Sequence, residues 1–335
     1  MSVHELNASV RKERRKWRDT YTLDERRTEL SFILDETNHS FAAGEDVAAT
    51  VDRLVGWLHE LRADSDPDTW AKLVPIAQAH PVGDRLLQDP FTRRSFEKPR
   101  GYSGDGVLLD LLYRHPSIHD LVAASSRLGR EIYACTSVSN SARAVQERRS
   151  ILAGVVDATA ERTTDAEILS IACGHLREAE LSGALADGRL KRWLALDQDH
   201  LNLATVARDW KGTVVEPMPA RVKELIGGTY HTGTFDLAYT AGVYDYLPRE
   251  NAVLLTRRLV DLVKPGGEVL FANFSTEVVP DGYMETFMNW PLILRDEVGI
   301  WDIVNASVDR NTVEADVFFG ENRHIIYAKI RRKAG

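Results

Sequence analysis

The chain has few cysteines and no long apolar run. Only Cys135 and Cys173 occur among its 335 residues, too few for a disulfide framework, which is typical of a reducing compartment. No apolar stretch approaches the roughly 20 residues that a bilayer-spanning helix needs. The N-terminal stretch MSVHELNASVRKERRKW lacks the apolar segment of a secretory signal. These absences predict a cytoplasmic protein with no membrane span.

An excess of positive charge is also missing. The formal net charge is -8, whereas affinity for nucleic acid comes mainly from basic groups on phosphates. The acidic balance therefore predicts no nucleic-acid partner. The one basic run, at residues 11–18, is followed by acidic residues within two turns, and we interpret it as an exposed helix face. No metal site is predicted.

The N-terminal part of the chain has the pattern of successive helices. Apolar residues recur at helical spacing in LDERRTELSFILDETNHSF and in DVAATVDRLVGWLHELRA. Loops that contain Pro, Gly and Asp separate these segments. We expect residues 1–148 to form a helical cap or lid domain, whose long helices could pair with a second copy in a homodimer.

The pattern changes after about residue 165. Short apolar runs alternate with helical ones, and these runs are EILSIACG, RWLALDQD, TVVEPM, FDLAYTAG and GGEVLFANF. Such alternation indicates βαβ units and a parallel sheet. The runs TVEADVFF and RHIIYAKIRR, joined by the turn GEN, instead indicate an antiparallel hairpin. For residues 149–335 we predict an α/β, doubly wound (Rossmann-like), mostly parallel seven-stranded sheet with an antiparallel C-terminal strand.

Small residues follow the first predicted strand. Ala172, Cys173 and Gly174 stand at its carboxyl end, where parallel α/β sheets bind ligands, and small residues let the backbone approach a ligand closely. A helix predicted to begin near Arg177 would offer its N-terminal N–H groups. An ordinary tight turn is the alternative interpretation.

An acid ends the second predicted strand. Asp197 lies 23 residues beyond Gly174 and can accept both hydroxyls of an adenosine ribose, whereas Asp199 suits the cap of the next helix. A nicotinamide dinucleotide would use the same acid, but its pyrophosphate needs a G-x-G-x-x-G turn, and positions 172–177 read ACGHLR. S-adenosylmethionine carries no phosphate, so the pattern favours this methyl donor.

Four segments resemble a known enzyme class. ILSIACGHLREAE, LALDQD, FDLAYTAGVYDYL and LVKPGGEVLFANF, in this order across residues 165–275, resemble the core motifs of class I S-adenosylmethionine-dependent methyltransferases. The C-terminal hairpin also resembles that fold, whose sheet ends in a reversed strand. The glycine turn departs from the family pattern, because only Gly174 matches a motif usually richer in glycine.

A narrower resemblance covers nearly the whole chain. KPRGYSGDG, NSARAVQERR and FMNWPLILRDE resemble a bacterial family assigned to 3-hydroxypalmitic acid methyl ester biosynthesis. This resemblance implies a carboxyl O-methyltransferase that acts on a fatty-acid-like or natural-product substrate in secondary metabolism.

The methyltransferase resemblance implies a set of cofactor-binding residues. Residues 172–174 would border the methionine part of the cofactor, Asp197 would hold the ribose and Gln198 would flank the adenine. The end of the third strand would contact the adenine ring, through Glu216, Pro217 and Met218. Met218 could equally be core filler.

The end of the fourth strand would lie beneath the transferable methyl. Its residues are Thr240, Ala241 and Gly242. Tyr244 and Tyr246 follow where the family often places substrate-facing aromatic residues. We assign Tyr244 to catalysis and Tyr246 to the cofactor, with inward packing of Tyr246 as the alternative.

A carboxylate acceptor is already ionised near pH 7 and needs no general base. It needs a cationic clamp, for which arginine is well suited. We assign Arg148 to catalysis, Arg143 to the cofactor, and Arg100 and Arg295 to the substrate, with an ordinary surface position as the alternative for each. A phenol or amine acceptor would instead need a base, and the candidates are His175, Glu216, Asp245 and Tyr244.

Aromatic residues outside the core motifs complete the predicted site. Tyr102, on the glycine-bearing loop EKPRGYSGDG, is predicted to be catalytic and to hydrogen-bond the cofactor or substrate when the lid closes. A buried interdomain tyrosine is the alternative. Tyr283 and Trp290, after the fifth strand, are expected to form an apolar wall for the substrate.

We therefore predict a small-molecule methyltransferase that uses S-adenosylmethionine and releases S-adenosylhomocysteine. Three other functions stay open at this point. The acceptor could be an amine or phenol in secondary metabolism, the enzyme could be a nicotinamide-dependent oxidoreductase, or the chain could be a catalytically silent scaffold protein that binds the cofactor.

Overall fold

The computed structural model describes residues 21–228 and 233–334, and these form two compact units. The helical unit comprises residues 21–103, 114–139 and 279–291, and the sheet unit comprises residues 104–113, 140–278 and 292–334. The expected boundary at residue 148 falls inside a continuous helix, α10 (Asn140–Arg162). Because the chain passes between the units several times, a single cut in the sequence does not describe them. The basic run at 11–18 lies outside the described residues.

The helical unit consists of short and medium helices. They are α2 (Leu23–Ala43), α3 (Val47–Ala63), α4 (Pro67–Gln78), α5 (Val82–Leu86), α6 (Pro90–Glu97), the 3-10 helix η1 (Pro116–Ile118), α8 (His119–Ala123), α9 (Arg127–Thr136) and α15 (Asp281–Thr286). Most of them begin with a side-chain cap, whereas α5, α8 and α15 do not. Thr22 and Glu25 form a capping box at the start of α2, and Gly44, at φ 73°, ends it.

Helix α15 is distant in sequence but belongs to this unit. Arg62 of α3 donates from Nη1 to Asp281 at 2.7 Å and from Nη2 to Glu285 at 2.7 Å. Trp70 Nε1 of α4 donates to the same Glu285 carboxylate. This network pairs carboxylates that are mostly buried and so fixes α15 to α3 and α4.

The sheet unit contains one seven-stranded sheet. Its strands are β1 (Ala166–Ile171), β2 (Leu190–Asp197), β3 (Val215–Pro219), β4 (Phe235–Thr240), β5 (Val263–Phe274), β6 (Val313–Phe319) and β7 (Ile325–Arg332). The order across the sheet is β3-β2-β1-β4-β5-β7-β6. Strands β1 to β5 pair in parallel, and β7 runs antiparallel to both β5 and β6. The predicted fold class, mostly parallel with a reversed C-terminal strand, is confirmed.

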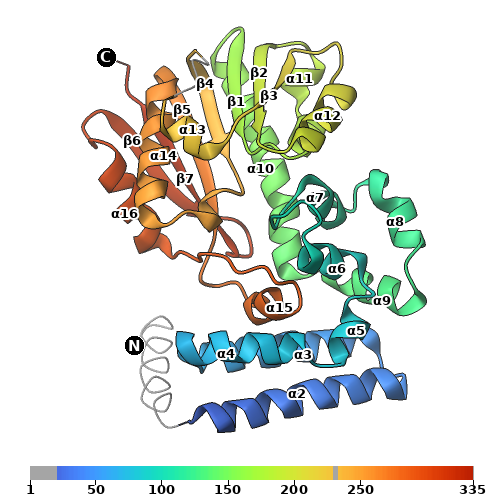
Figure 1. The fold of residues 1–335 in the computed structure, drawn as a ribbon. Helices are drawn as coiled ribbons and strands as arrows, with labels where there is room; N and C mark the ends of the chain where they lie inside the picture. Colours follow the sequence, from blue (N-terminus) through green and yellow to red (C-terminus); the bar gives the residue numbers. More distant parts are fainter. Residues whose placement is uncertain (1–20, 229–232, 335) are drawn as a thin grey trace. The chain divides into compact units, whose positions relative to one another are not determined.

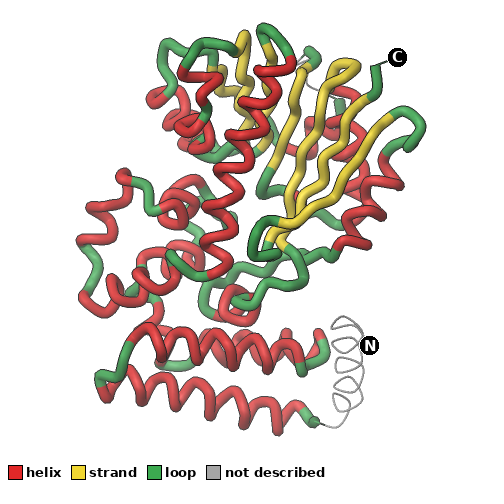
Figure 2. Tube along the Cα trace, turned by 180° about the vertical axis from the view of Figure 1, so that it is seen from behind, coloured by secondary structure: helices red, strands yellow, loops and turns green. Residues whose placement is uncertain are grey.

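Helices cover both faces of the sheet. Besides α10, the helices of the sheet unit are α7 (Gly106–Tyr113), η2 (Arg177–Leu181), α11 (Gly183–Ala186), α12 (His200–Asp209), α13 (Val222–Ile226), η3 (Tyr244–Tyr246), α14 (Arg249–Leu262) and α16 (Glu297–Ser307). Figure 1 shows α14 and α16 on one side of the sheet, and Figure 2, drawn from behind, shows α10 on the other. The main core joins strand residues such as Leu169 and Phe271 to Leu259 of α14 and Ile300 of α16.

The connection from β1 to β2 differs from the prediction. The expected helix from Arg177 is replaced by the five-residue 3-10 helix η2 and the short α11. Asp157 of α10 accepts hydrogen bonds from Ser182 Oγ and from the backbone N–H groups of Gly183 and Ala184, which starts a new helix there. Consequently no regular α-helix begins at the end of the β1 turn.

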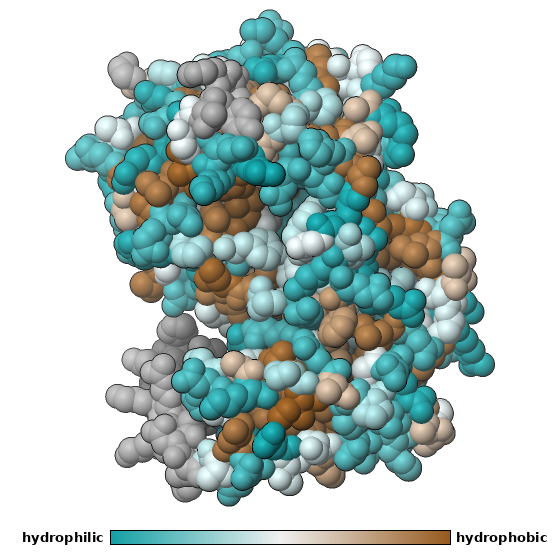
Figure 3. Space-filling view, in the orientation of Figure 1, coloured by the Kyte–Doolittle hydropathy of each residue, from teal (hydrophilic) through white to brown (hydrophobic). Residues whose placement is uncertain are grey.

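None of the described helices is both long and apolar enough to cross a membrane. Figure 3 shows hydrophilic and hydrophobic residues mixed over the face that it draws.

Candidate functional site

The site is built around the point where the strand order changes direction. Strand β1 has β2 on one side and β4 on the other. From β1 the chain adds β2 and β3 in one direction across the sheet, and from β4 it adds β5 in the opposite direction. In an open α/β sheet the carboxyl ends of strands at such a point leave a crevice that binds ligands. The residues that follow β1, β2 and β4 are therefore the candidates.

The turn after β1 alternates between ordinary and left-handed backbone. Ala172 has φ 53°, Gly174 has φ 56° and Leu176 has φ 54°. Only glycine adopts this conformation without a steric cost. The backbone thus has the alternating geometry of a glycine-rich turn at positions 172, 174 and 176, although two of the three residues carry side chains. Sequence reasoning missed this, because neither alanine nor leucine signals positive φ.

Asp197, at the tip of β2, holds this turn in place. Its side chain is buried, with 5% exposure. Oδ2 accepts the Gly174 N–H at 2.8 Å, and Oδ1 accepts the Asp199 N–H at 2.8 Å and the Asn202 Nδ2 at 3.4 Å. Burial raises the pKa of Asp197. A carboxylate has about four acceptor positions, so roughly one remains for a ribose hydroxyl. To accept hydrogen bonds from both ribose hydroxyls, Asp197 would have to give up the long hydrogen bond from Asn202.

Asp199 has the capping role that the sequence suggested for it. Its Oδ1 accepts the Leu201 N–H at 2.9 Å at the start of α12.

A buried charged cluster supports the turn from the side of α7. Asp110 accepts His175 Nδ1 at 2.8 Å and receives Arg177 Nε and Nη2 at 2.8 and 3.0 Å. Burial alone would raise the pKa of Asp110, but the hydrogen bonds from His175 and Arg177, together with the guanidinium charge of Arg177, outweigh it and hold the pKa below its usual value. His175 is committed to this cluster and does not cap a helix. The sequence could not reveal this cluster, because Asp110 lies 65 residues before His175.

Gly106, the first residue of α7, lies close to the same cluster. A Cβ atom there would lie 2.5 Å from His175 Cδ2 and 2.6 Å from Asn202 Oδ1. Asp105 caps α7 by accepting the N–H groups of Val107 and Leu108. Gly106, the last glycine of the loop EKPRGYSGDG, therefore allows close packing between α7 and the turn.

The residues predicted to surround adenine occupy varied environments. Gln198 is exposed, and Pro217 is half-buried. Glu216 pairs with Arg192 Nε at 2.8 Å on the neighbouring strand. Met218 is partly buried and packs against the main core, which agrees with the interpretation as core filler.

At the end of β4, exposure increases along the chain. Thr240 is buried, Ala241 is half-buried and Gly242 is exposed. Arg148 of α10 is buried and donates from Nη1 to the Ala241 carbonyl. Arg143, five residues earlier on α10, is exposed.

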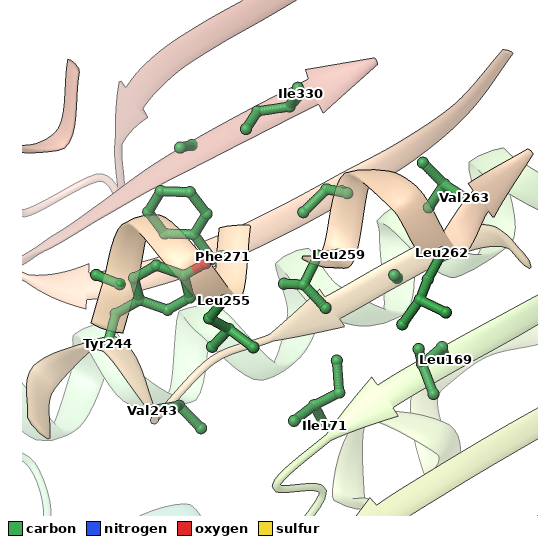
Figure 4. Close-up of a cluster of buried hydrophobic side chains, with 14 of the residues drawn as sticks. Leu169, Ile171, Val243, Tyr244, Leu255, Leu259, Leu262, Val263, Phe271 and Ile330 are labelled. Atoms are coloured by element: carbon green, nitrogen blue, oxygen red, sulfur yellow. The ribbon is translucent and has the colours of Figure 1, made fainter. Parts of the chain in front are cut away.

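Tyr244 does not have the environment of a catalytic residue. It is 0% exposed, its ring stacks on Phe271 with centroids 4.0 Å apart, and its hydroxyl hydrogen-bonds Thr256 at 2.7 Å. Figure 4 shows it among the aliphatic side chains of the core. Because η3 turns this ring inward, Tyr244 packs in the core of this structure, and its catalytic role stays a prediction. Tyr246, two residues on, is exposed instead.

Arg295 hydrogen-bonds the backbone after β4, and its predicted substrate contact stays a prediction. Its guanidinium donates to the carbonyls of Tyr244 and Leu247 and to Asn273. Burial lowers the pKa of Arg295. Beside it, Asp245 accepts the Phe274 N–H at 2.6 Å. These bonds tie the segment after β4 to the end of β5.

The predicted aromatic wall belongs to the helical unit. Tyr283 is buried there and its hydroxyl hydrogen-bonds Thr92 at 3.0 Å. Its predicted contact with the substrate stays a prediction. Trp290 is buried in the same unit, and Arg100 and Tyr102 are partly buried in it. The roles predicted for Arg100, Tyr102 and Trp290 stay predictions.

The described residues contain no group of three or more His, Cys, Asp or Glu side chains that could hold a metal ion.

Solved structures with a similar fold are known. A protein from Bordetella parapertussis, described as a possible exported protein, aligns over 79% of this chain and 96% of its own, with a TM-score of 0.58 and 16% identity. The N-methyltransferase NodS from Bradyrhizobium japonicum, in complex with S-adenosylhomocysteine, aligns over 67% of this chain and 99% of its own, at a TM-score of 0.41 and 16% identity. An O-methyltransferase family protein from Burkholderia thailandensis aligns over 69% of this chain and 71% of its own, with a TM-score of 0.44 and 15% identity.

At 16% identity, the similarity to the Bordetella parapertussis protein supports the fold but not an activity. The TM-scores of the other two structures are too low to support either the fold or an activity. No family model and no curated protein matches the chain. The resemblance to the 3-hydroxypalmitic acid methyl ester family therefore stays a prediction.

Proposed function

We propose that this protein is an S-adenosylmethionine-dependent methyltransferase that acts on a small molecule. The observation that carries the proposal is the turn at 172–176, whose left-handed residues alternate and whose Gly174 N–H is held by Asp197. This arrangement brings the turn, in which Ala172 is an exposed residue, next to a buried carboxylate that keeps an acceptor position. Backbone at a strand end and an acid on the neighbouring strand suit a nucleoside.

The same turn suits a pyrophosphate poorly. A dinucleotide site places its phosphates on the N-terminus of a regular helix, but here the turn leads into the short η2. Glu178, the second residue of η2, is a buried acid and would repel a phosphate. In addition, β7 lies between β5 and β6, unlike the dinucleotide-binding order 3-2-1-4-5-6. These features favour a phosphate-free nucleoside over a nicotinamide cofactor.

S-adenosylmethionine supplies, when bound, a methyl group already activated by its sulfonium. The protein's part is then to bind, to orient the acceptor and to exclude water. Asp197 would hold the ribose and residues 172–174 would border the methionine part.

The side chains considered as a general base all have partners. His175 hydrogen-bonds Asp110, Glu216 pairs with Arg192, Asp245 accepts a backbone N–H, and Tyr244 lies in the core. This supports the finer proposal of a carboxylate acceptor, which is ionised near pH 7 and needs no base. N-methylation, phenol O-methylation and a silent scaffold are the competing outcomes of the assays.

Calorimetry with S-adenosylhomocysteine and with NAD tests the cofactor. We expect S-adenosylhomocysteine to bind and NAD not to bind, and the reverse result would overturn the proposal. Asp197→Asn should weaken the affinity of the protein for S-adenosylhomocysteine at least tenfold, because loss of a hydrogen bond to a charged group costs about 1.5–3 kcal/mol. Asp187→Asn, at an exposed acid, is the matched control and should leave the affinity unchanged.

A screen with radiolabelled methyl donor against carboxylic acids, amines and phenols tests transfer itself. Tight cofactor binding without transfer to any class would point to the scaffold alternative. Tyr102→Phe in the same screen tests the predicted role of Tyr102, and unchanged affinity and turnover would remove that role. The proposed cytoplasmic location and homodimer are tested separately, by cell fractionation and by light scattering.

A further inference from the structure

A buried arginine lies at the end of β4 without a matching anion. Arg148 is 5% exposed, and Nη1 donates to the Ala241 carbonyl. Its Nε has no hydrogen-bond partner among the described residues. No carboxylate of the part of the chain that the structure describes lies within ion-pair distance of it. The acids whose charges interact with Arg148 are Asp245 and Glu178, and the Tyr113 hydroxyl also interacts with its guanidinium.

Those two acids act on Arg148 only from a distance. Asp245 accepts the Phe274 N–H, and Glu178 accepts the Tyr239 hydroxyl at 2.6 Å. An arginine cannot lose its proton in a protein. A buried charge without a hydrogen-bonded counter-ion is costly, so the site is one that a bound anion would stabilise.

A second buried polar group of the sheet unit also lacks a hydrogen-bond partner in the part of the chain that the structure describes. The Tyr327 hydroxyl of β7 is buried and has no partner among the described residues. Helix α10, which carries Arg148, packs against β7, which carries Tyr327. Burial raises the pKa of Tyr327, and the positive charge of Arg148 acts against this rise. Tyr327 belongs to the sheet face that α10 covers, because its neighbours Ile326 and Ala328 point into the core on the other face.

We infer that Arg148 and the Tyr327 hydroxyl bind a carboxylate group of a ligand at the carboxyl end of β4. The planar guanidinium fork matches a carboxylate, and a phenol adds a neutral donor. β4 is the neighbour of β1, so this position lies beside the turn at 172–176. The inference rests on the proposed function, which offers two sources: the amino-acid carboxylate of the methyl donor and the carboxylate of an acceptor.

Calorimetry on Arg148→Gln distinguishes these sources. The probes are S-adenosylhomocysteine and 5′-methylthioadenosine, which lacks the amino-acid part. If the donor's carboxylate is bound, the affinity for the first probe falls about 10- to 100-fold and that for the second is unchanged. If the acceptor's carboxylate is bound, both nucleoside affinities persist, and binding of octanoate or benzoate to the product-loaded protein is lost.

Tyr327→Phe keeps the test valid if Arg148→Gln fails to fold. Removing an unpartnered buried hydroxyl should leave thermal stability unchanged or higher, yet weaken the same ligand about 3- to 10-fold. Arg162→Gln, at the far end of α10, removes the same charge and serves as the control. Unchanged affinity for every probe in both test variants overturns this inference alone, whereas a wild-type protein that binds neither nucleoside overturns the proposed function as well.

Discussion

The left-handed residues in the turn after β1 predict that two neighbouring substitutions, Ala172→Gly and Gly174→Ala, change the stability of the protein in opposite directions. Ala172 and Gly174 have almost the same φ, 53° and 56°. Ala172 is exposed, so replacing it by glycine removes no buried contact. At Gly174 an added Cβ would lie 3.5 Å from Leu109 Cδ1, an ordinary contact distance. Backbone conformation therefore dominates both substitutions.

The magnitude follows from two opposing effects. A left-handed conformation costs a residue with a Cβ about 1–2 kcal/mol. Glycine in turn increases the freedom of the unfolded chain, which costs about 0.4–1 kcal/mol. The difference is about 0.5–1 kcal/mol, so Ala172→Gly should stabilise the protein and Gly174→Ala should destabilise it by that amount. For a unit of this size the melting temperature should shift by about 1–4 °C in each direction.

Thermal melting of the two variants beside wild type measures the shifts. Ala204→Gly is the matched control, because this exposed alanine lies inside α12, where glycine should cost about 1 kcal/mol. If Ala172→Gly lowers the melting temperature as Ala204→Gly does, Ala172 is not left-handed, and the geometric basis of the proposed nucleoside site is lost. Unchanged affinity for S-adenosylhomocysteine in Ala172→Gly would show that the turn keeps its shape.

Three further predictions concern the surrounding structure. Gly106→Ala would place a Cβ 2.5 Å from the His175 ring and should destabilise the protein by about 1–3 kcal/mol, measured by urea unfolding; no loss would contradict this packing. Burial raises the pKa of Asp245 to about 6, so the native state binds its proton more tightly than the unfolded chain. Relative to Asp245→Asn, wild type should therefore lose about 2.5 kcal/mol of stability between pH 4 and 7.5, and a pH-independent difference would refute this. Arg62→Ala should cost about 3 kcal/mol in the same assay by removing the guanidinium that pairs with two mostly buried acids on α15, and Arg62→Lys should recover part of that loss.

The order of the elements was readable from the chain because it depends on local periodicity. The runs that contain Leu169, Leu194 and Phe271 are short and apolar between polar turns, as strands buried on both faces must be. The reversed final strand followed from the hairpin signal between Val313 and Arg332. The start of a helix followed where a cap was recognised, as at Asp199. The connection after Leu176 was misjudged, since Asp157, far away in the sequence, starts a new helix there.

The direction in which a side chain points was not readable in this way. Tyr244 and Tyr246 are two residues apart in one aromatic motif, yet the first is in the core and the second is exposed. Arg143 and Arg148 belong to one basic segment, and only Arg148 is buried. Such differences depend on which face of a helix or turn meets the sheet, and this is decided by contacts that are distant in the sequence.

By itself, then, the amino-acid sequence determined the alternation of strands and helices, the reversed last strand and the position of Asp197 at a strand tip, because each follows from neighbours along the chain. Tertiary structure alone decided that Asp110 supports His175, that Arg295 serves the backbone after β4, and that the turn keeps left-handed geometry at Ala172. These features arise only when segments far apart in the chain pack together, and packing can impose a backbone conformation that the residue type does not favour.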